Sequence, residues 1–395
     1  MESNIKLHGH PITLSSYTAP QIRTNKHFQH YSLPDFERFY LPESMTAFTD
    51  LASFEQKEFI IDDNRSVVTR DPVLRVDGVD FYQNVKGIGS TTGPFSRKPL
   101  KKTDITGFLK DSPVTSRILR AEEMPRARYF TSEMWSRGSP YGIQGLDYAS
   151  IAMRAAEMAD SPTFIHGFRI APIVKIVHLP QDLQEVRKIY WYRQFSGPMV
   201  QETRLVPSNV RVYFHSDHTL GGDTSWVFDL FEIDTNEKAL QFETNFLKSG
   251  MAILTLFVRS MKDDGDGTFT GLDYYDVYLD KDALLAPDGT IFWADLEGLE
   301  RMNVRKKDLE EKMEYQIHRS RYEFLCAYEQ IEIERARRFG HPTDRKVHFA
   351  YLLRDALKDD EVIELVQDGT SLNLNIGNIL GEKSATKQFT ILNFG

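Results

Sequence analysis

β-Like runs of apolar and polar positions occupy much of the first half of the chain. Two of these runs, 73–76 and 79–85, are joined by Asp77-Gly78, and an Asp-Gly pair between such runs is a strong signal for a hairpin. Between about residues 146 and 159, small apolar side chains recur at helical spacing and predict one helix. Further strands are predicted by the runs at 168–178, 188–193 and 199–212.

The second half of the chain has mainly helical patterning. Helices are predicted over 236–261, over the strongly charged stretch 305–339, and over 343–358. A short strand is expected at 290–294, ending at Asp295, and short strands are expected in the tail. The sequence therefore predicts the α+β class, in the order typical of a bilobal protein-kinase-like fold with nucleotide in the cleft between its lobes. The predicted parts are an irregular arm at 1–50, a β-rich N-lobe with one helix at 51–214, and a mainly helical C-lobe with a small β tail at 215–395.

Composition narrows the class of protein. The 395 residues are enough for two lobes that each have a core, and the net charge of −9 disfavours nucleic acid as the main partner. The single cysteine, Cys326, rules out a disulfide framework and a cysteine-based zinc site. The N-terminus lacks the apolar core of a signal peptide, and the most apolar stretch, 250–258, is too short to cross a bilayer. We therefore expect a cytoplasmic protein without a membrane partner.

A glycine-rich run follows the second strand of the predicted hairpin. It begins with Lys86, contains Gly87 and Gly89, and ends at Arg97. Glycines let the backbone approach a ligand closely, and amides flanked by basic side chains suit phosphate oxygens. The spacing matches neither a Walker A loop nor a dinucleotide-binding loop. The run is a candidate nucleotide-binding loop, and its alternative is a solvated glycine turn.

Two further sets of residues could act with Lys86. Arg204 and Arg211 could clamp phosphates with their planar guanidinium groups, or they could be exposed residues of an edge strand. Glu157, on the predicted helix, could pair with Lys86 in the way that a helix glutamate orients the lysine of protein kinases. Its alternative is a plain carboxylate on the helix surface.

Acidic residues on both sides of the short strand predicted at 290–294 suggest a metal site. Asp280 and Asp282 precede that strand, Asp295 follows it, and Pro287-Asp-Gly289 supplies a hairpin turn between them. Magnesium that bridges phosphates takes one or two carboxylates from the protein. This spacing is compatible with the kinase scheme of a catalytic loop, a hairpin and a metal-binding Asp. A solvated acidic loop is the alternative.

Two of these segments, 86–97 and 203–211, resemble motifs of the selenoprotein O family of kinase-fold protein adenylyltransferases. The first resembles its Lys-Gly-x-Gly run on the lysine strand, and the second resembles its Thr-Arg-Val-Ala-x-Ser-x-Ile-Arg segment. The resemblance implies ATP and Mg²⁺ as cofactors and transfer of AMP to a protein hydroxyl, with phosphoryl transfer as a close variant. The roles that it implies are phosphate neutralisation by Lys86, Arg204 and Arg211, Mg²⁺ binding by Asp282 and Asp295, and orientation or deprotonation of the acceptor hydroxyl by Asp280.

Two other functions remain open at this point. Lys86-x-x-Gly89 also fits the motif of covalent nucleotidyltransferases of the ligase type, in which a lysine attacks ATP and becomes adenylated. A third interpretation is a non-catalytic pseudokinase or interaction scaffold, whose charged helix at 306–338 binds a partner. The acceptor is expected to be a protein or a small molecule in the first function.

Overall fold

The computed structural model divides the chain into two compact units. Unit 1 comprises Met1–Thr163 and Ala171–Asn209, and unit 2 comprises Phe164–Ile170 and Val210–Gly395. The short segment 164–170 therefore belongs to unit 2 although both of its sequence neighbours belong to unit 1. The residues that the structure describes are 3–7, 10–14, 21–33, 59–63, 66–87, 144–178, 198–212, 225–274, 283–342, 344–366, 371–375 and 386–390.

Unit 1 is built on an eight-stranded antiparallel sheet. Its main path has the order β3-β11-β12-β7-β5-β4, while β6 pairs with β7 and β8 pairs with β12. A separate hairpin is formed by β1 (Ser3–Leu7) and β2 (His10–Leu14). The strands of the large sheet are β3 (Ile22–Thr24), β4 (Phe59–Asp63), β5 (Ser66–Thr69), β6 (Leu74–Val76), β7 (Val79–Lys86), β8 (Gln144–Gly145), β11 (Ile173–His178) and β12 (Met199–Val206).

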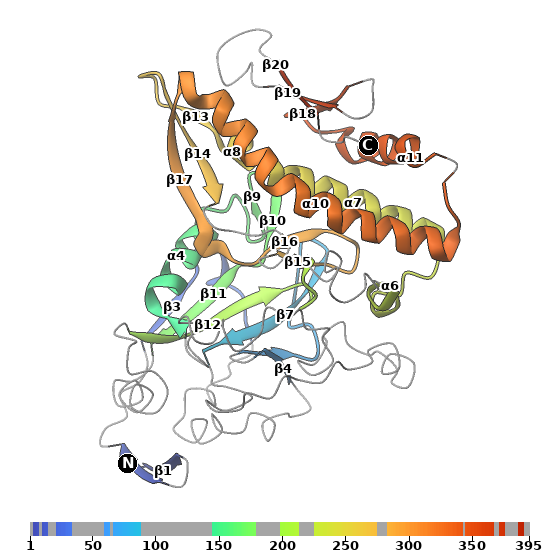
Figure 1. Cartoon of the computed structure of the whole chain (residues 1–395). Helices are drawn as coiled ribbons and strands as arrows, with labels where there is room; N and C mark the ends of the chain where they lie inside the picture. Colours follow the sequence, from blue (N-terminus) through green and yellow to red (C-terminus); the bar gives the residue numbers. More distant parts are fainter. Residues whose placement is uncertain are drawn as a thin grey trace. The chain divides into compact units, whose positions relative to one another are not determined.

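One helix of unit 1, α4 (Leu146–Glu157), packs against this sheet beside β11 and β12 (Figure 1). Its buried positions recur every three or four residues and carry Ala149, Ala152, Met153 and Ala156. These side chains are mostly small, so the helix backbone can lie close to the strands. An ion pair of 2.7 Å from Arg23 of β3 to Glu157 ties the end of the helix to the edge of the sheet.

Unit 2 contains five described α-helices, of which α7 and α10 lie side by side (Figure 1). At their contact the rings of Phe246 and Phe324 stack, with centroids 5.4 Å apart and an interplanar angle of 5°. Gly250 leaves room for this pair, because a Cβ at that position would come within 1.9 Å of the Phe324 ring. The helices are α6 (Ser225–Leu230), α7 (Asn236–Leu254), α8 (Leu256–Ser260), α10 (Leu309–Phe339) and α11 (Arg345–Leu357).

Three small sheets accompany these helices in unit 2. Their strand orders are β15-β16-β10-β9, β13-β14-β17 and β18-β19-β20, and β10 pairs with β16 in parallel. The first sheet therefore joins the segment 164–170 to a hairpin from much later in the chain. The strands are β9 (Phe164–Ile165), β10 (Phe168–Ile170), β13 (Lys262–Asp263), β14 (Thr268–Tyr274), β15 (Ala283–Leu285), β16 (Ile291–Trp293), β17 (Leu299–Arg305), β18 (Ile363–Leu365), β19 (Ser371–Asn375) and β20 (Thr386–Thr390).

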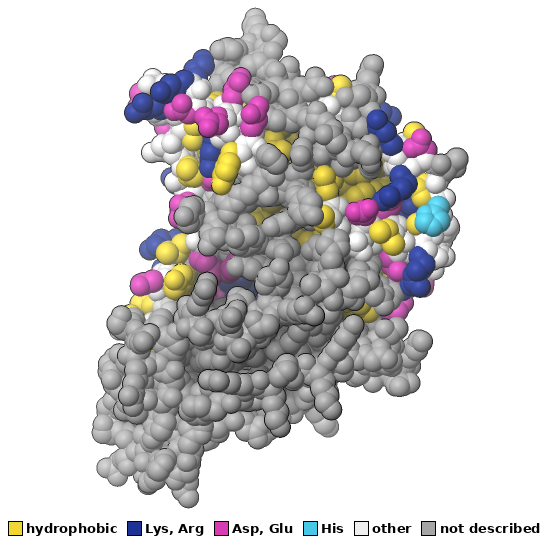
Figure 2. Space-filling model, viewed as in Figure 1, with side chains coloured by type: hydrophobic (Ala, Val, Ile, Leu, Met, Phe, Trp, Pro, Cys, Tyr) yellow, Lys and Arg dark blue, Asp and Glu magenta, His cyan; other side chains and the backbone are white. Residues whose placement is uncertain are grey.

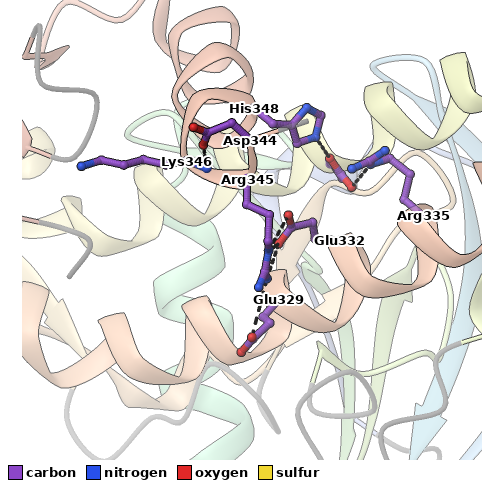
Figure 3. Close-up of polar contacts among 8 residues, drawn as sticks. Glu329, Glu332, Arg335, Asp344, Arg345, Lys346 and His348 are labelled. Carbon is purple, nitrogen blue, oxygen red and sulfur yellow. Dashed lines mark hydrogen bonds and ion pairs between the residues drawn. The ribbon is translucent and has the colours of Figure 1, made fainter. Parts of the chain in front are cut away.

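Ion pairs fasten α11 to α10 and α7. Arg345 of α11 holds Glu332 of α10 through three hydrogen bonds: Nε donates to Oε1 at 3.0 Å and to Oε2 at 3.1 Å, and Nη2 donates to Oε2 at 2.6 Å (Figure 3). Arg335 of α10 donates to Glu243 of α7, and His348 of α11 lies 3.1 Å from the second oxygen of the same carboxylate. The buried carboxylate of Glu243 thus has partners on two other helices, as buried charges in proteins require.

The outer surface of the described residues mixes charge and apolar side chains. On the face drawn in Figure 2, Lys and Arg lie beside Asp and Glu, and hydrophobic side chains lie among them. None of the described helices is long and apolar enough to cross a membrane. The largest exposed fractions among apolar side chains of unit 2 belong to Tyr315, Val347 and Tyr351.

The predicted α+β class is confirmed, and several predicted elements are found. Asp77 and Gly78 have φ angles of 50° and 79° and join β6 to β7 as expected for a hairpin turn. The run 168–178 is not one strand, because it breaks at Ala171-Pro172 into β10 and β11, which belong to different units. Strands β14 and β17 were not predicted. The run 188–193 lies outside the described residues.

Candidate functional site

Lys86 is the last residue of β7, a strand in the middle of the large sheet of unit 1. It is 6% exposed. Directly opposite it stand Glu202 on β12 and Ser66 on β5. Residues directly opposite one another in a sheet point to the same face, with Cβ atoms about 5 Å apart. A buried lysine therefore lies beside a buried carboxylate and a buried hydroxyl.

The carboxylate of Glu202 has partners for both oxygens. Oε1 accepts hydrogen bonds from Arg204 Nη2 at 2.7 Å and from Arg204 Nε at 3.1 Å. Oε2 accepts one from Gln144 Nε2 at 2.8 Å. Glu202 and Arg204 are two positions apart on one strand, so their side chains share a face. The side chains of Glu202 and Arg204 are 0% and 3% exposed, which makes this a deeply buried charged cluster.

Arg204 was expected either to clamp phosphates or to lie exposed on an edge strand. The second alternative is wrong, since β12 lies between β11 and β7 and Arg204 is 2% exposed. Its guanidinium group lies against Glu202. Arg211, by contrast, lies beyond the end of β12 and belongs to unit 2, where it forms an isolated bridge with Leu284 of β15.

Gly87 directly follows Lys86 and has a structural reason to be glycine. Its φ angle is 82°, and a Cβ there would lie 2.4 Å from the backbone oxygen of Val200 and 3.0 Å from the Cβ of Gln144. Close contact between the chain after β7 and strands β12 and β8 therefore requires the glycine. Gly89 and Arg97, the other residues of the predicted loop, lie outside the described residues.

Glu157, which was predicted to pair with Lys86, forms an ion pair with Arg23. The distance from Arg23 Nη2 to Glu157 Oε2 is 2.7 Å, and the two side chains are 40% and 23% exposed. The residue in the centre of the cluster, Glu202, was missed by the sequence-based search. Its signal was the spacing of Glu202 and Arg204, two opposite charges at alternate positions of one predicted strand.

Asp295 lies in unit 2, two positions after the end of β16. The side chain of Trp293 donates from Nε1 to the backbone oxygen of Asp295 at 3.1 Å. The predicted turn ahead of β16 is present, because Gly289 has a φ angle of 90° and lies between β15 and β16. Asp280 and Asp282 lie outside the described residues. Among the residues that are described, no group of three His, Cys, Asp or Glu side chains could hold a metal ion.

A groove of about 610 Å³ lies elsewhere in unit 2, between β17 and the first turns of α10. Its lining includes Arg305, Lys312 and Tyr315 together with the acidic Asp308 and Glu311. Of the predicted site residues that the structure describes, none lines this groove.

Comparisons with protein-family models, with curated proteins and with solved structures find no significant match to this chain. The residues themselves, above all the cluster around Lys86, are therefore the basis for a proposed function.

Proposed function

We propose that this chain is an ATP- and Mg²⁺-dependent transferase with a bilobal protein-kinase-like fold. It transfers AMP or a phosphoryl group from ATP to a hydroxyl group of a protein or small molecule. The observation that carries the proposal is Lys86, a lysine that is 6% exposed in the middle of a sheet and stands directly opposite the buried carboxylate of Glu202.

The burial of Lys86 is the first support. An ammonium group loses most of its hydration on burial, so buried lysines are rare unless an anion accompanies them. Glu202 is one such anion within the protein. Phosphate oxygens of a nucleotide are the other common partner of a lysine at the end of a strand, where lysine acts as a compact point charge.

The order of elements around Lys86 is the second support. In protein kinases the phosphate-binding lysine lies on a strand, and the next helix packs near it. Here β7 carries Lys86. The first helix described after it is α4, which follows β8 and packs against the same sheet. Strands β11 and β12 follow α4 in the chain and complete the sheet beside β7.

Asp295 is the candidate metal ligand of unit 2. It follows the buried hairpin β15–β16, as the metal-binding Asp of protein kinases follows a hairpin. Mg²⁺ suits a site of this kind, because it binds through one or two carboxylates and completes its shell with phosphate oxygens and water. When bound, Mg²⁺ would neutralise the charge that develops on the phosphates. Asp282 is the second carboxylate that the resemblance implies.

The reaction is tested by incubating the full chain with Mg²⁺ and ATP labelled at the α- or the γ-phosphate. Label from the α-position on a hydroxyl acceptor indicates AMP transfer, and label from the γ-position indicates phosphoryl transfer. We expect Asp295→Asn to reduce labelling about a hundredfold or more. The matched control Asp359→Asn, at an exposed position, should leave it unchanged.

Two results would overturn the proposal. The first is no transfer from either label with any acceptor, including the protein itself, accompanied by no ATP binding. The second is a hydroxylamine-labile adduct on the chain that is lost in Lys86→Ala, which would indicate a covalent nucleotidyltransferase instead.

A further inference from the structure

We propose that Glu202, not Glu157, is the positioning residue that orients Lys86 toward the nucleotide phosphates. This inference rests on the proposed function and concerns the same site. Protein kinases orient their lysine with a glutamate from the neighbouring helix. In this chain the orienting carboxylate comes from the neighbouring strand, β12.

The register of the sheet places the two candidate glutamates at different distances from Lys86. Arg23, Ile176, Glu202 and Lys86 stand opposite one another on the successive strands β3, β11, β12 and β7. Lys86 is therefore one strand spacing from Glu202 and three spacings, about 14 Å, from Arg23. Because Glu157 pairs with Arg23, its carboxylate lies at the edge of the sheet, whereas Glu202 lies on a central strand.

Burial separates the two glutamates further. The Glu202 side chain is 0% exposed, so its carboxylate cannot turn to solvent and its charge acts on its neighbours with little screening. The Arg23–Glu157 pair has side chains that are 40% and 23% exposed, and ion pairs of that kind contribute little. A residue that fixes a catalytic lysine must itself be held rigidly, which is true of Glu202.

The hydrogen bonds of Glu202 connect the three elements around Lys86. One oxygen holds Arg204, and the other accepts from Gln144 at 2.8 Å. Gln144 belongs to β8, which leads directly into α4, and a Cβ on Gly87 would lie 3.0 Å from the Gln144 Cβ. The carboxylate thus connects the arginine to β8 at the entry to α4, at the register position directly opposite Lys86.

The test measures ATP affinity in the presence of Mg²⁺ by isothermal titration calorimetry on the full chain. The variants are Glu202→Gln and its matched control Glu157→Gln, which makes the same chemical change on α4. We expect Glu202→Gln to weaken binding about tenfold and Glu157→Gln to change it less than about twofold. A milder variant, Gln144→Ala, removes one hydrogen bond to Glu202 without a change of charge, and we expect a loss of about threefold.

Repeating these variants in the Lys86→Met background separates positioning from general destabilisation. If Glu202 acts through Lys86, Glu202→Gln and Gln144→Ala should each change affinity less than about twofold once Lys86 is absent. A conservative variant, Glu202→Asp, should recover part of the affinity. If Glu202→Gln does not fold, the inference is judged from Gln144→Ala alone, by comparing its loss of ATP affinity with and without Lys86.

The possible failures are distinguishable. Suppose first that the wild-type chain binds ATP. This inference alone is then overturned if Glu157→Gln weakens binding as much as Glu202→Gln does. It is also overturned if Gln144→Ala weakens binding equally with and without Lys86. A wild-type chain that binds no ATP overturns the proposed function and this inference together.

Discussion

Glu243 of α7 and Arg335 of α10 form a buried ion pair, with 2.7 Å between Oε1 and Nε. Their side chains are 0% and 5% exposed. The second oxygen of Glu243 lies 3.1 Å from Nε2 of His348 on α11, so one carboxylate connects three helices. Loss of the Glu243 carboxylate should therefore affect all three helices.

Replacing Glu243 by Leu should lower the free energy of unfolding by about 3–5 kcal/mol, because Arg335 is left buried without its carboxylate. The double variant Glu243→Leu, Arg335→Met should recover most of that loss, since neither charge is then unpaired. Urea unfolding followed by far-UV circular dichroism measures both. A double variant as unstable as the single one would show that the ion pair is not the cause.

Tyr328 of α10 gives a prediction about pH. Burial raises its pKa well above the usual range, and the nearby charges of Glu243 and Glu332 raise it further. A pKa that is higher in the folded chain gives stability that is complete below the unfolded value of about 10 and is lost as the pH rises above it. The urea midpoint of the wild type should therefore fall between pH 8 and pH 10.5.

Tyr328→Phe should lessen that alkaline fall. At pH 8 it should leave the free energy of unfolding unchanged or raise it by up to about 1 kcal/mol, because the buried hydroxyl meets no hydrogen-bond partner among the described residues. The ring contact with Phe349, at 5.2 Å between centroids, is retained in the variant. A variant that loses stability at pH 8, or that shows the same alkaline fall, contradicts this interpretation of the hydroxyl.

Gly87 and Gly78 form a matched pair for a test of backbone crowding. Their φ angles are 82° and 79°, but a Cβ at Gly87 would lie 2.4 Å from a backbone oxygen, whereas a Cβ at Gly78 would meet nothing within 4 Å. Gly78→Ala should therefore cost about 1 kcal/mol from the left-handed backbone alone. Gly87→Ala should cost about 3 kcal/mol or more, since β12 must move as well. Equal losses in urea unfolding would rule out the crowding argument.

Local signals explain which elements of the fold could be predicted. The Asp77-Gly78 turn and the helix α4 are encoded within short windows, by turn residues in one case and by a small apolar stripe in the other. Strands β14 and β17 were missed because glycine and charged residues, among them Gly271, Asp273, Arg301 and Arg305, interrupt their apolar positions, and β14 is stabilised by pairing with β13 and β17. Pairing between distant segments, such as β10 with β16, leaves no local pattern.

The sequence singled out the lysine of the candidate site, Lys86, but not its carboxylate, Glu202. Lys86 was singled out by its position at a strand end before glycines. Glu202 and Arg204 looked like ordinary charges of a strand, because burial depends on whether β12 is central or at an edge, and the order of strands decides that. The helix glutamate, Glu157, was chosen from the kinase pattern, whereas the structure gives it Arg23 as a partner.

The most direct test of the proposed nucleotide site is the affinity of the full chain for ATP with Mg²⁺, compared between the wild type and Lys86→Met. Methionine keeps much of the buried volume of Lys86 while removing its charge. We expect the wild type to bind ATP and Lys86→Met to bind at least about tenfold more weakly, with unchanged circular dichroism. The exposed Lys262→Met, as a control, should bind as the wild type does. Absence of binding by the wild type, or equal binding by Lys86→Met, would contradict the proposal.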